Sequence, residues 1–140
     1  VIRALEVTLA TGAPFSRQTQ AGTPPPFPSR CAALTLPREA LYGRIDLRVE
    51  KMLDAGLAEE VKALLDSGVP ADCQSMKGLG YKELVPYLRG ETSLAEARAA
   101  IQKGSRRYAK RQLTWLRAER DVFWAEDGAS IERYFTEAEA

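Results

Sequence analysis

The chain has 140 residues, 45% of them hydrophobic, and a formal net charge of +1; this is enough apolar material for one modest core and favours a single domain. The sequence contains no histidine, which excludes Ser-His and Cys-His nucleophile arrangements and most zinc sites. No apolar run is long enough to span a membrane and no signal-peptide pattern is present. The two isolated cysteines are interpreted as reduced thiols, so we expect a cytoplasmic protein.

The first residues predict a helix followed by a loop. Apolar residues recur on one face of a helix over residues 2–11, which Gly12 ends. These apolar residues are Ile2, Leu5 and Leu9. The chain starts without Met and inside this periodic pattern, so we expect it to be the C-terminal segment of a longer protein. Residues 13–30 form a Pro-rich loop, in which the prolines between residues 24 and 28 favour polyproline II.

The central part predicts a strand and three helices. An apolar run over residues 31–36 is typical of a buried strand, and a helix over residues 37–56 follows it. A second helix covers residues 57–66, and a glycine-punctuated loop over residues 76–81 leads into a short helix that ends at Gly90. The inward face of the first of these helices consists of Leu41, Ile45, Val49 and Met52.

The last third predicts a long helix over residues 93–120, which begins with a capping box at residues 93–96. Gly104 is the weak point of this helix. A strand over residues 122–124 and a terminal helix from about Ser130 complete the pattern. The segment is therefore predicted to be mainly α-helical with one or two short strands, and these strands need partners that the chain barely supplies.

The helix over residues 93–120 has a basic face and an apolar face. Between residues 98 and 120 the sequence has eight basic residues and one acidic residue, while the rest of the chain carries a net charge of −6. Such a row indicates a polyanion on one side and a protein core on the other; the alternative is the solvated face of an ordinary amphipathic helix. The basic face consists of Lys103, Arg106, Arg107, Lys110, Thr114 and Arg117, and the apolar face of Ala97, Ile101, Tyr108, Trp115 and Leu116.

A second basic row lies on the helix over residues 37–56. Arg44, Arg48 and Lys51 share one face of it, and arginine on a helix can bind a phosphate or diphosphate through two parallel hydrogen bonds. The alternative is a solvated face with ion pairs inside the helix, to Glu39, Asp46 or Glu50.

The loop over residues 76–81 carries paired glycines, Gly78 and Gly80, before Tyr81 and Lys82. Paired glycines let a backbone approach a ligand closely, and the two following side chains can stack on a base and hold its phosphate. The alternative is a tight turn before a helix. The pattern is not a P-loop, because GxxxxGK[ST] occurs nowhere in the chain.

The two cysteines, Cys31 and Cys73, are isolated in the sequence and lack the spacing of metal ligands. We expect both to be reduced thiols, with a long-range disulfide between them as the alternative. No metal site is predicted in this segment.

Four stretches of the chain together match the order and spacing of a known family over about residues 1–125. They are Arg3-Ala-Leu-Glu6 with Thr11-Gly12, Leu41-Tyr-x-Arg-Ile-Asp-x-Arg-Val49 with Met52-Leu53 and Gly56, Gly78-Leu-Gly-Tyr-Lys-Glu83, and Ser105-Arg-Arg-Tyr-Ala-Lys-Arg-Gln-Leu-Thr-Trp-Leu-Arg117. They resemble the tRNA dimethylallyltransferases, also called tRNA isopentenyltransferases. The run that starts at Ala109 is the most specific of the four.

The resemblance implies transfer of a dimethylallyl group from dimethylallyl diphosphate to N6 of the adenine 3′ of the tRNA anticodon. It implies a parent α/β fold of P-loop kinase-like type, with Mg²⁺ as cofactor, and we expect a monomer. Arg48, together with Arg44, is expected near the diphosphate. The residues expected to contact the tRNA anticodon stem-loop are Arg3, Met76, Lys77, Gly78, Leu79, Gly80, Tyr81, Lys82, Glu83, Arg106, Arg107, Lys110, Arg111, Gln112, Thr114 and Arg117.

By the same resemblance, the P-loop, the catalytic base and the magnesium ligands lie upstream of Val1, so the segment alone is expected to be inactive. The chain also has Ser105-Arg106-Arg107 where the family has Thr-Arg-Gln; the extra arginine is expected to strengthen phosphate binding and loosen selectivity. Two alternatives stay open. One is a non-catalytic RNA-binding module, and the other is a helical subdomain of an ordinary P-loop kinase that holds only nucleotide phosphates.

Overall fold

The computed structural model describes residues 2–18, 29–119 and 121–137. The chain divides into two compact units, Val1–Arg30 and Cys31–Ala140, whereas its composition alone favours one domain. Each unit is described by itself below. The polyproline II segment predicted between residues 24 and 28 lies outside the described residues.

The first unit contains the predicted helix and a short one that was not predicted. Helix α1 (Ile2–Thr11) has the predicted bounds, and its apolar face is exposed to solvent. Helix α2 (Phe15–Gln18) lies inside the predicted loop. Its first turn includes a hydrogen bond from the Arg17 N–H to the Pro14 carbonyl, 2.9 Å long. A proline before a helix suits its first turn, so Pro14 favours the start of α2.

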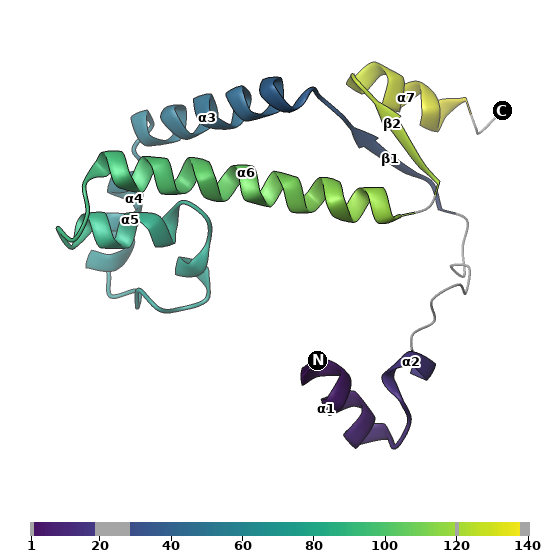
Figure 1. Ribbon diagram of the computed structural model, residues 1–140. Helices are drawn as coiled ribbons and strands as arrows, with labels where there is room; N and C mark the ends of the chain where they lie inside the picture. The colour runs from purple at the N-terminus through teal and green to yellow at the C-terminus, as the bar shows by residue number, and fades with distance from the viewer. Residues whose placement is uncertain (1, 19–28, 120, 138–140) are drawn as a thin grey trace. The chain divides into compact units, whose positions relative to one another are not determined.

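The second unit is mainly helical with two short strands, as the sequence predicts (Figure 1). The two strands pair with each other, which corrects the expectation that the chain barely supplies partners for them. Strands β1 (Cys31–Leu34) and β2 (Val122–Ala125) pair in parallel, with Cys31 opposite Val122 and Leu34 opposite Ala125. The helices are α3 (Arg38–Asp54), α4 (Leu57–Asp66), the single 3₁₀ turn η1 (Ser75–Lys77), α5 (Tyr81–Leu88), α6 (Leu94–Ala118) and α7 (Gly128–Thr136).

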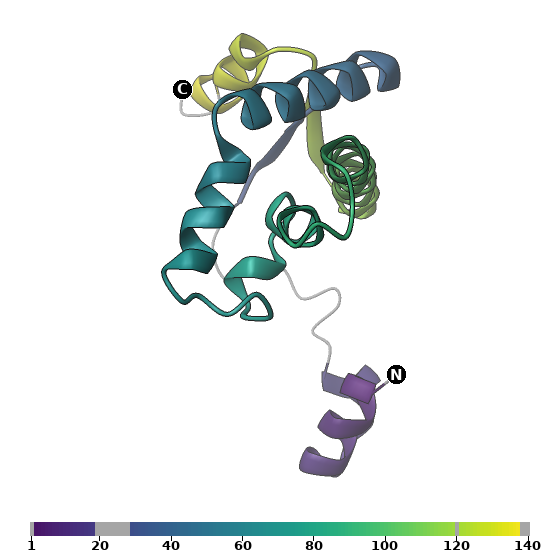
Figure 2. The ribbon, with the colours of Figure 1, turned by 90° about the vertical axis from the view of Figure 1, so that its left-hand side faces the viewer.

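The main core of this unit lies between α3, α4, η1, α5 and the first half of α6, which Figure 2 shows grouped around it. Its buried members are Val49, Leu57, Val61, Met76, Leu84, Val85, Ala97 and Ile101. Val61 and Leu84 have no exposed surface, and full burial of such a side chain contributes about 1.5–3 kcal/mol. Outside this core, α7 packs on the strands, where the rings of Phe123 and Tyr134 stack with their centroids 4.4 Å apart.

Local signals define where the helices begin and end. The predicted capping box is present at the start of α6: the Glu96 N–H donates to Ser93 Oγ, and the Ser93 N–H donates to Glu96 Oε2 at 2.8 Å. Gly56, which has a φ of 96°, separates α3 from α4. A left-handed residue at this position ends one helix and turns the chain into the next.

Helix α6 continues through Gly104 without a break. A Cβ atom at this position would lie only 2.5 Å from Leu79 Cδ1. Gly104 therefore lets the segment between η1 and α5 approach α6 closely, which explains a glycine in the interior of a helix that would otherwise favour alanine.

The predicted apolar face of α6 is buried only in its first half. Ala97 and Ile101 are buried, but Tyr108 is 52% exposed and Trp115 is 62% exposed. The expectation that these two rings face a core is therefore wrong for the described residues. The reason is geometric, because α4 and α5 lie beside the first half of α6 and do not reach its second half (Figure 1).

None of the described helices is both long and apolar enough to cross a membrane.

Candidate nucleic-acid interface

Polar contacts between α3 and α6 hold the candidate site together. Asp46 pairs with Arg106, and Glu50 accepts a hydrogen bond of 3.0 Å from Gln102. Glu50 also lies 3.2 Å from Arg98 Nε, as an ion pair without hydrogen-bond alignment. Because these contacts step back along α3 as they advance along α6, the two helices run in opposite directions.

These pairs bear on two expectations from the sequence: the ion pairs inside the helix over residues 37–56, and the place of Arg106 on the basic face of the helix over residues 93–120. Asp46 and Glu50 do not pair with basic residues inside α3; they pair with α6, because α3 packs against it. Arg106 was predicted to lie on the free basic face, but its side chain is only 30% exposed and is held by Asp46. Part of the basic surplus of α6 therefore stabilises the fold.

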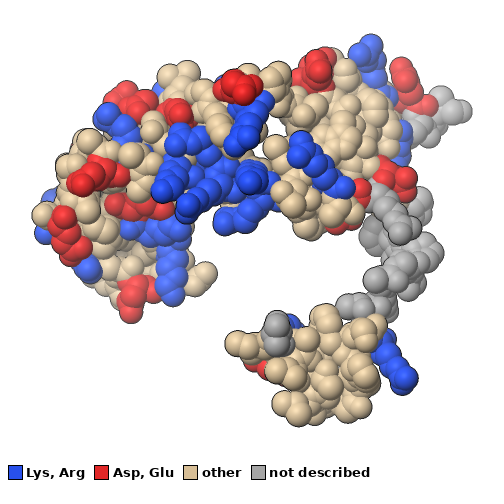
Figure 3. All heavy atoms as spheres, viewed as in Figure 1, with Lys and Arg blue, Asp and Glu red and all other residues tan. Residues whose placement is uncertain are grey.

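The remaining basic residues of α6 form an exposed row. Figure 3 shows Lys and Arg side chains gathered over α6 and the neighbouring α3. Within the part of the chain that the structure describes, no carboxylate forms an ion pair with this row. Its exposed members are Lys103, Arg107, Lys110, Arg111 and Arg117. A row of uncompensated cations in this arrangement attracts a polyanion.

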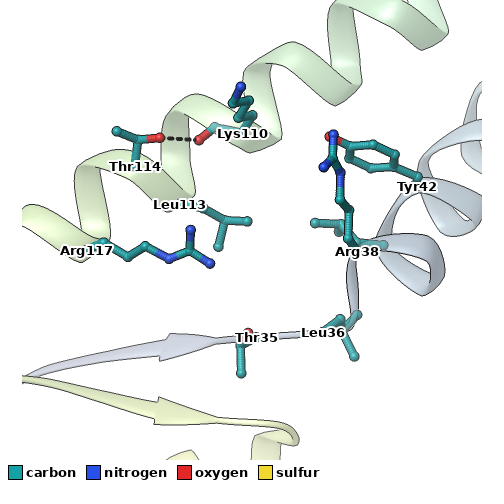
Figure 4. Close-up of a pocket in the computed structure, with 9 residues that line it drawn as sticks. Thr35, Leu36, Arg38, Tyr42, Lys110, Leu113, Thr114 and Arg117 are labelled. Carbon is teal, nitrogen blue, oxygen red and sulfur yellow. Dashed lines mark hydrogen bonds between the residues drawn. The ribbon is translucent and has the colours of Figure 1, made fainter.

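The second half of this row borders a pocket of about 230 Å³ (Figure 4). The pocket lies between the end of β1, the first turns of α3 and the last turns of α6. Predicted tRNA contacts from α6 meet residues here that the sequence analysis did not select, above all Arg38 and Tyr42. The lining residues are Thr35, Leu36, Arg38, Leu41, Tyr42, Lys110, Leu113, Thr114 and Arg117. The Thr114 hydroxyl donates to the Lys110 carbonyl at 2.9 Å.

A second, more apolar groove of about 430 Å³ runs between α3 and α6. Arg48 lines this groove, whereas Arg44, although exposed, is not one of its lining residues. Of the two arginines that were predicted to lie near a diphosphate, Arg48 therefore lines this groove, and the shared role of Arg44 stays a prediction. The lining residues are Leu41, Ile45, Arg48, Val49, Met52, Leu79, Ile101, Ser105, Tyr108, Ala109 and Gln112. Gln112 also lines a shallow depression on α6 with Arg111, Trp115 and Leu116.

The predicted tRNA-contact loop, Met76 to Glu83, divides into buried and exposed residues. Met76 is 1% exposed and belongs to the core, so it supports the loop from inside. Glu83 Oε2 accepts a hydrogen bond of 2.8 Å from the Gly80 N–H and fixes the start of α5. The exposed members, which are available to a ligand, are Lys77, Gly78, Leu79 and Lys82.

Tyr81 was predicted to stack on a base, and its contacts within the chain are extensive. Its ring packs against the core cluster, and its hydroxyl donates to Glu60 on α4. The hydrogen bond to Glu60 raises the pKa of Tyr81 above its usual value, and partial desolvation adds to this effect. Tyr81 thus ties the loop to α4, and stacking on a base stays a prediction.

Arg3 belongs to the first unit, where its side chain is exposed and lies 3.8 Å from Glu6. Its predicted contact with tRNA stays a prediction.

The matching family model is that of the IPP transferases, and it covers residues 1–119. The chain belongs to this family. It is 48% identical over 125 residues to the tRNA dimethylallyltransferase of Pelotomaculum thermopropionicum, a match of 89% of the chain and 40% of that protein. It is 50% identical over 125 residues to the tRNA dimethylallyltransferase of Geobacillus kaustophilus, a match of 89% of the chain and 39% of that protein.

A solved structure agrees with this assignment to the IPP transferases. The full-length tRNA isopentenylpyrophosphate transferase from Bacillus halodurans superposes with a TM-score of 0.75 at 39% sequence identity, over 99% of this chain and 43% of that one. The chain therefore spans about 40% of the length of the curated relatives that it matches.

For this IPP transferase chain, the sequence analysis missed Arg38, Tyr42 and Thr35. The signal was weak but present: Pro37 and Arg38 come immediately after a predicted strand, and ligands bind beyond the carboxyl ends of parallel strands. Neither Arg38 nor Tyr42 lies on the predicted basic row of α3.

Metal binding receives no support from the described residues of this family member. They include no group of three or more His, Cys, Asp or Glu side chains that could hold a metal ion. Both cysteines are free thiols. The expected Mg²⁺, whose ligands were predicted to lie upstream of Val1, stays a prediction.

Proposed function

We propose that this chain contributes the tRNA-binding part of an enzyme that transfers a dimethylallyl group from dimethylallyl diphosphate to N6 of the adenine 3′ of the anticodon. The observation that carries the proposal is the exposed, unpaired basic row on α6, in a chain whose relatives are tRNA dimethylallyltransferases. The parent fold that we propose is of P-loop kinase type, acts as a monomer and uses Mg²⁺ held by residues outside this chain.

The chemistry explains why such a surface is needed. The exocyclic amine of adenine is a weak nucleophile, so the base must be unstacked, shielded from water and aligned with the allylic carbon. A bond forms between N6 and that carbon while the bond to the diphosphate oxygen breaks, and negative charge develops on the leaving group. N6 gives up a proton to the catalytic base, which is expected upstream of this chain. Arg48, at the side of the α3–α6 groove, is proposed to stabilise that charge.

Recognition of the anticodon loop is proposed to rest on phosphate contacts. Single-stranded RNA loops are held through their backbone and their unstacked bases. The exposed residues of the Met76–Glu83 loop and the basic row of α6 both belong to the second unit, and Gly104 brings the loop close to α6. One RNA hairpin that contacts both is therefore proposed.

Fluorescence titration of the 140-residue chain with an adenine-containing anticodon stem-loop, against a plain RNA duplex, tests the binding half of the proposal. About six phosphate contacts should reduce the affinity roughly 10²–10³-fold between 50 and 200 mM salt. Preferential, salt-sensitive binding of the stem-loop is the expected result. Equal binding of both RNAs, or no binding by a folded chain, would contradict it.

The catalytic half is tested in a polypeptide that carries this segment together with an upstream P-loop half. Arg48→Ala should abolish dimethylallyl transfer while leaving tRNA affinity within about twofold, because Arg48 is proposed to contact the diphosphate and not the RNA. If tRNA binding occurs but no upstream half restores transfer, the chain is a non-catalytic RNA-binding module.

A further inference from the structure

We propose that the pocket between the end of β1, the start of α3 and the end of α6 binds a backbone phosphate of the RNA, and that Arg38 is a phosphate-contacting residue. This inference rests on the proposed function and adds a residue that the family resemblance does not assign. Arg38 is expected to act together with Lys110 and Arg117, which line the same pocket.

The charges around the pocket favour the binding of an anion. Three of its nine lining residues are basic and none is acidic. Among the described residues, no carboxylate forms an ion pair with Arg38, Lys110 or Arg117. Figure 4 shows that Arg117 reaches from α6 toward the side that β1 and α3 form, while Arg38 rises from the first turn of α3. Cations that line one pocket without a counter-charge favour the binding of an anion that neutralises them.

The position of Arg38 is not explained by the stability of its own helix. Arg38 is the first residue of the 17-residue helix α3, where the helix dipole places partial positive charge and disfavours a cation. Tyr42, one turn later, holds the side chain in place: Arg38 Cζ lies 5.2 Å from the centre of its ring. A guanidinium stacked on a ring keeps its N–H edge free for a bidentate bond to phosphate.

The place of the pocket in the sheet is typical of a ligand site. β1 and β2 are parallel, and Leu34 at the end of β1 lies opposite Ala125 at the end of β2. The next two residues, Thr35 and Leu36, line the pocket. It therefore opens at the carboxyl ends of parallel strands, the edge at which open α/β sheets bind their ligands.

The extent of the basic row favours an RNA phosphate over a small free anion. From Arg117 at the pocket back to Lys103, the exposed basic residues of α6 cover 14 helical steps, or about 21 Å at ~1.5 Å per residue. A single phosphate or diphosphate would neutralise only the pocket. A polymer that continues along α6 neutralises the pocket and the row together.

The test is a salt-dependent titration of the full 140-residue chain with the anticodon stem-loop, for Arg38→Ala against Arg89→Ala. Arg89 is an exposed arginine at the end of α5 that lines none of these pockets, so this control removes the same charge elsewhere. Arg38→Ala should weaken binding about 10-fold at 50 mM salt and lower the log–log salt slope by about 0.7–1. Arg89→Ala should stay within about twofold of the unsubstituted chain.

Three more variants separate charge from geometry. Arg38→Lys should keep the salt slope but recover only part of the affinity, because lysine lacks the planar fork. Tyr42→Leu should weaken binding more than Tyr42→Phe, since only the latter keeps the ring beneath Arg38. Circular dichroism establishes that each variant is folded.

Three outcomes would overturn the inference. If the unsubstituted chain binds no RNA, the proposed function fails as well. If it binds the stem-loop but Arg38→Ala behaves like Arg89→Ala, the pocket holds no RNA phosphate while the proposed function stands. If Arg38→Ala abolishes binding of inorganic diphosphate and leaves RNA affinity unchanged, the pocket belongs to a small anion.

Discussion

Alanine substitution of two glycines in helix interiors should have opposite effects on stability. Gly43 on α3 and Gly104 on α6 both lie well inside their helices. No atom lies within 4 Å of a Cβ placed at Gly43, whereas a Cβ at Gly104 would lie 2.5 Å from Leu79 Cδ1 and 3.7 Å from Glu83 Oε1. Helix propensity is therefore the dominant effect at the first position, and crowding competes with it at the second.

The expected magnitudes follow from these distances. Alanine is favoured over glycine in a helix by about 1 kcal/mol, so Gly43→Ala should raise the free energy of unfolding by about 0.5–1 kcal/mol. At Gly104 the same gain is opposed by overpacking, which costs about 1–3 kcal/mol. The cost should lie toward the lower end, because Leu79 is 38% exposed and the end of its side chain can rotate. Gly104→Ala is therefore expected to be neutral or destabilising.

Urea denaturation of the two variants, with and without Leu79→Ala, measures these terms. In the Leu79→Ala background the crowding is removed, so Gly104→Ala should become stabilising by about 0.5–1 kcal/mol, as at Gly43. If Gly104→Ala stabilises the chain as much as Gly43→Ala does while Leu79 is still present, the Leu79 side chain changes rotamer without cost. Gly104 would then not be required for the close approach of the segment between η1 and α5 to α6.

Three further predictions concern stability. Trp115→Ala should lower the free energy of unfolding by less than about 1 kcal/mol, because the ring is 62% exposed. Leu84→Ala, at a fully buried position, should lower it by about 2–5 kcal/mol. Thermal and urea unfolding of the two variants measure this difference. Hydrogen bonds from Ser93 lower the pKa of Glu96 in the folded chain. The stability that the Glu96 carboxylate contributes is therefore complete above the unfolded pKa of about 4.3 and is lost as the pH falls through the lower folded pKa. Glu96→Gln should weaken the dependence of unfolding on acid below about pH 4.5. Asp46→Asn should lower the free energy of unfolding by about 0.5–1 kcal/mol. This loss should be smaller at high salt, because salt screens the ion pair with Arg106.

Local signals in the sequence predicted most of the helices. The capping box of Ser93 and Glu96 marked the start of α6, and Gly56 marked the end of α3, because these features act within one turn of the chain. The start of α5 was misplaced by the paired glycines: Tyr81, predicted in the loop, is the first residue of that helix. Asp127 was missed as the cap of α7, where it accepts a hydrogen bond of 2.7 Å from the Ser130 N–H.

Contacts between distant segments could not be predicted in the same way. The strand over 31–36 and the strand over 122–124 were both expected, but nothing local indicated that they pair in parallel with each other. The same limit explains why Arg38 was missed. Its neighbours in the pocket, Lys110 and Arg117, come from a helix that starts more than fifty residues later in the chain, and only the packing of α6 beside the end of β1 brings the three cations together.

The ion pairs of α6 also change how its charge is interpreted. The sequence places Arg106, Lys110 and Arg117 on one basic face. In the structure Arg106 pairs with a carboxylate on α3, as Arg98 does, while Lys110 and Arg117 line a pocket without any carboxylate. Removing Arg106 could weaken RNA binding without any direct contact to RNA, because its pair with Asp46 is one of the contacts that hold α3, which carries Arg38, against α6. Asp46→Asn distinguishes the two cases, since it disturbs the pair yet leaves the positive charge of Arg106 in place. A direct RNA contact would keep or raise affinity in that variant, whereas a role in holding α3 would lower it.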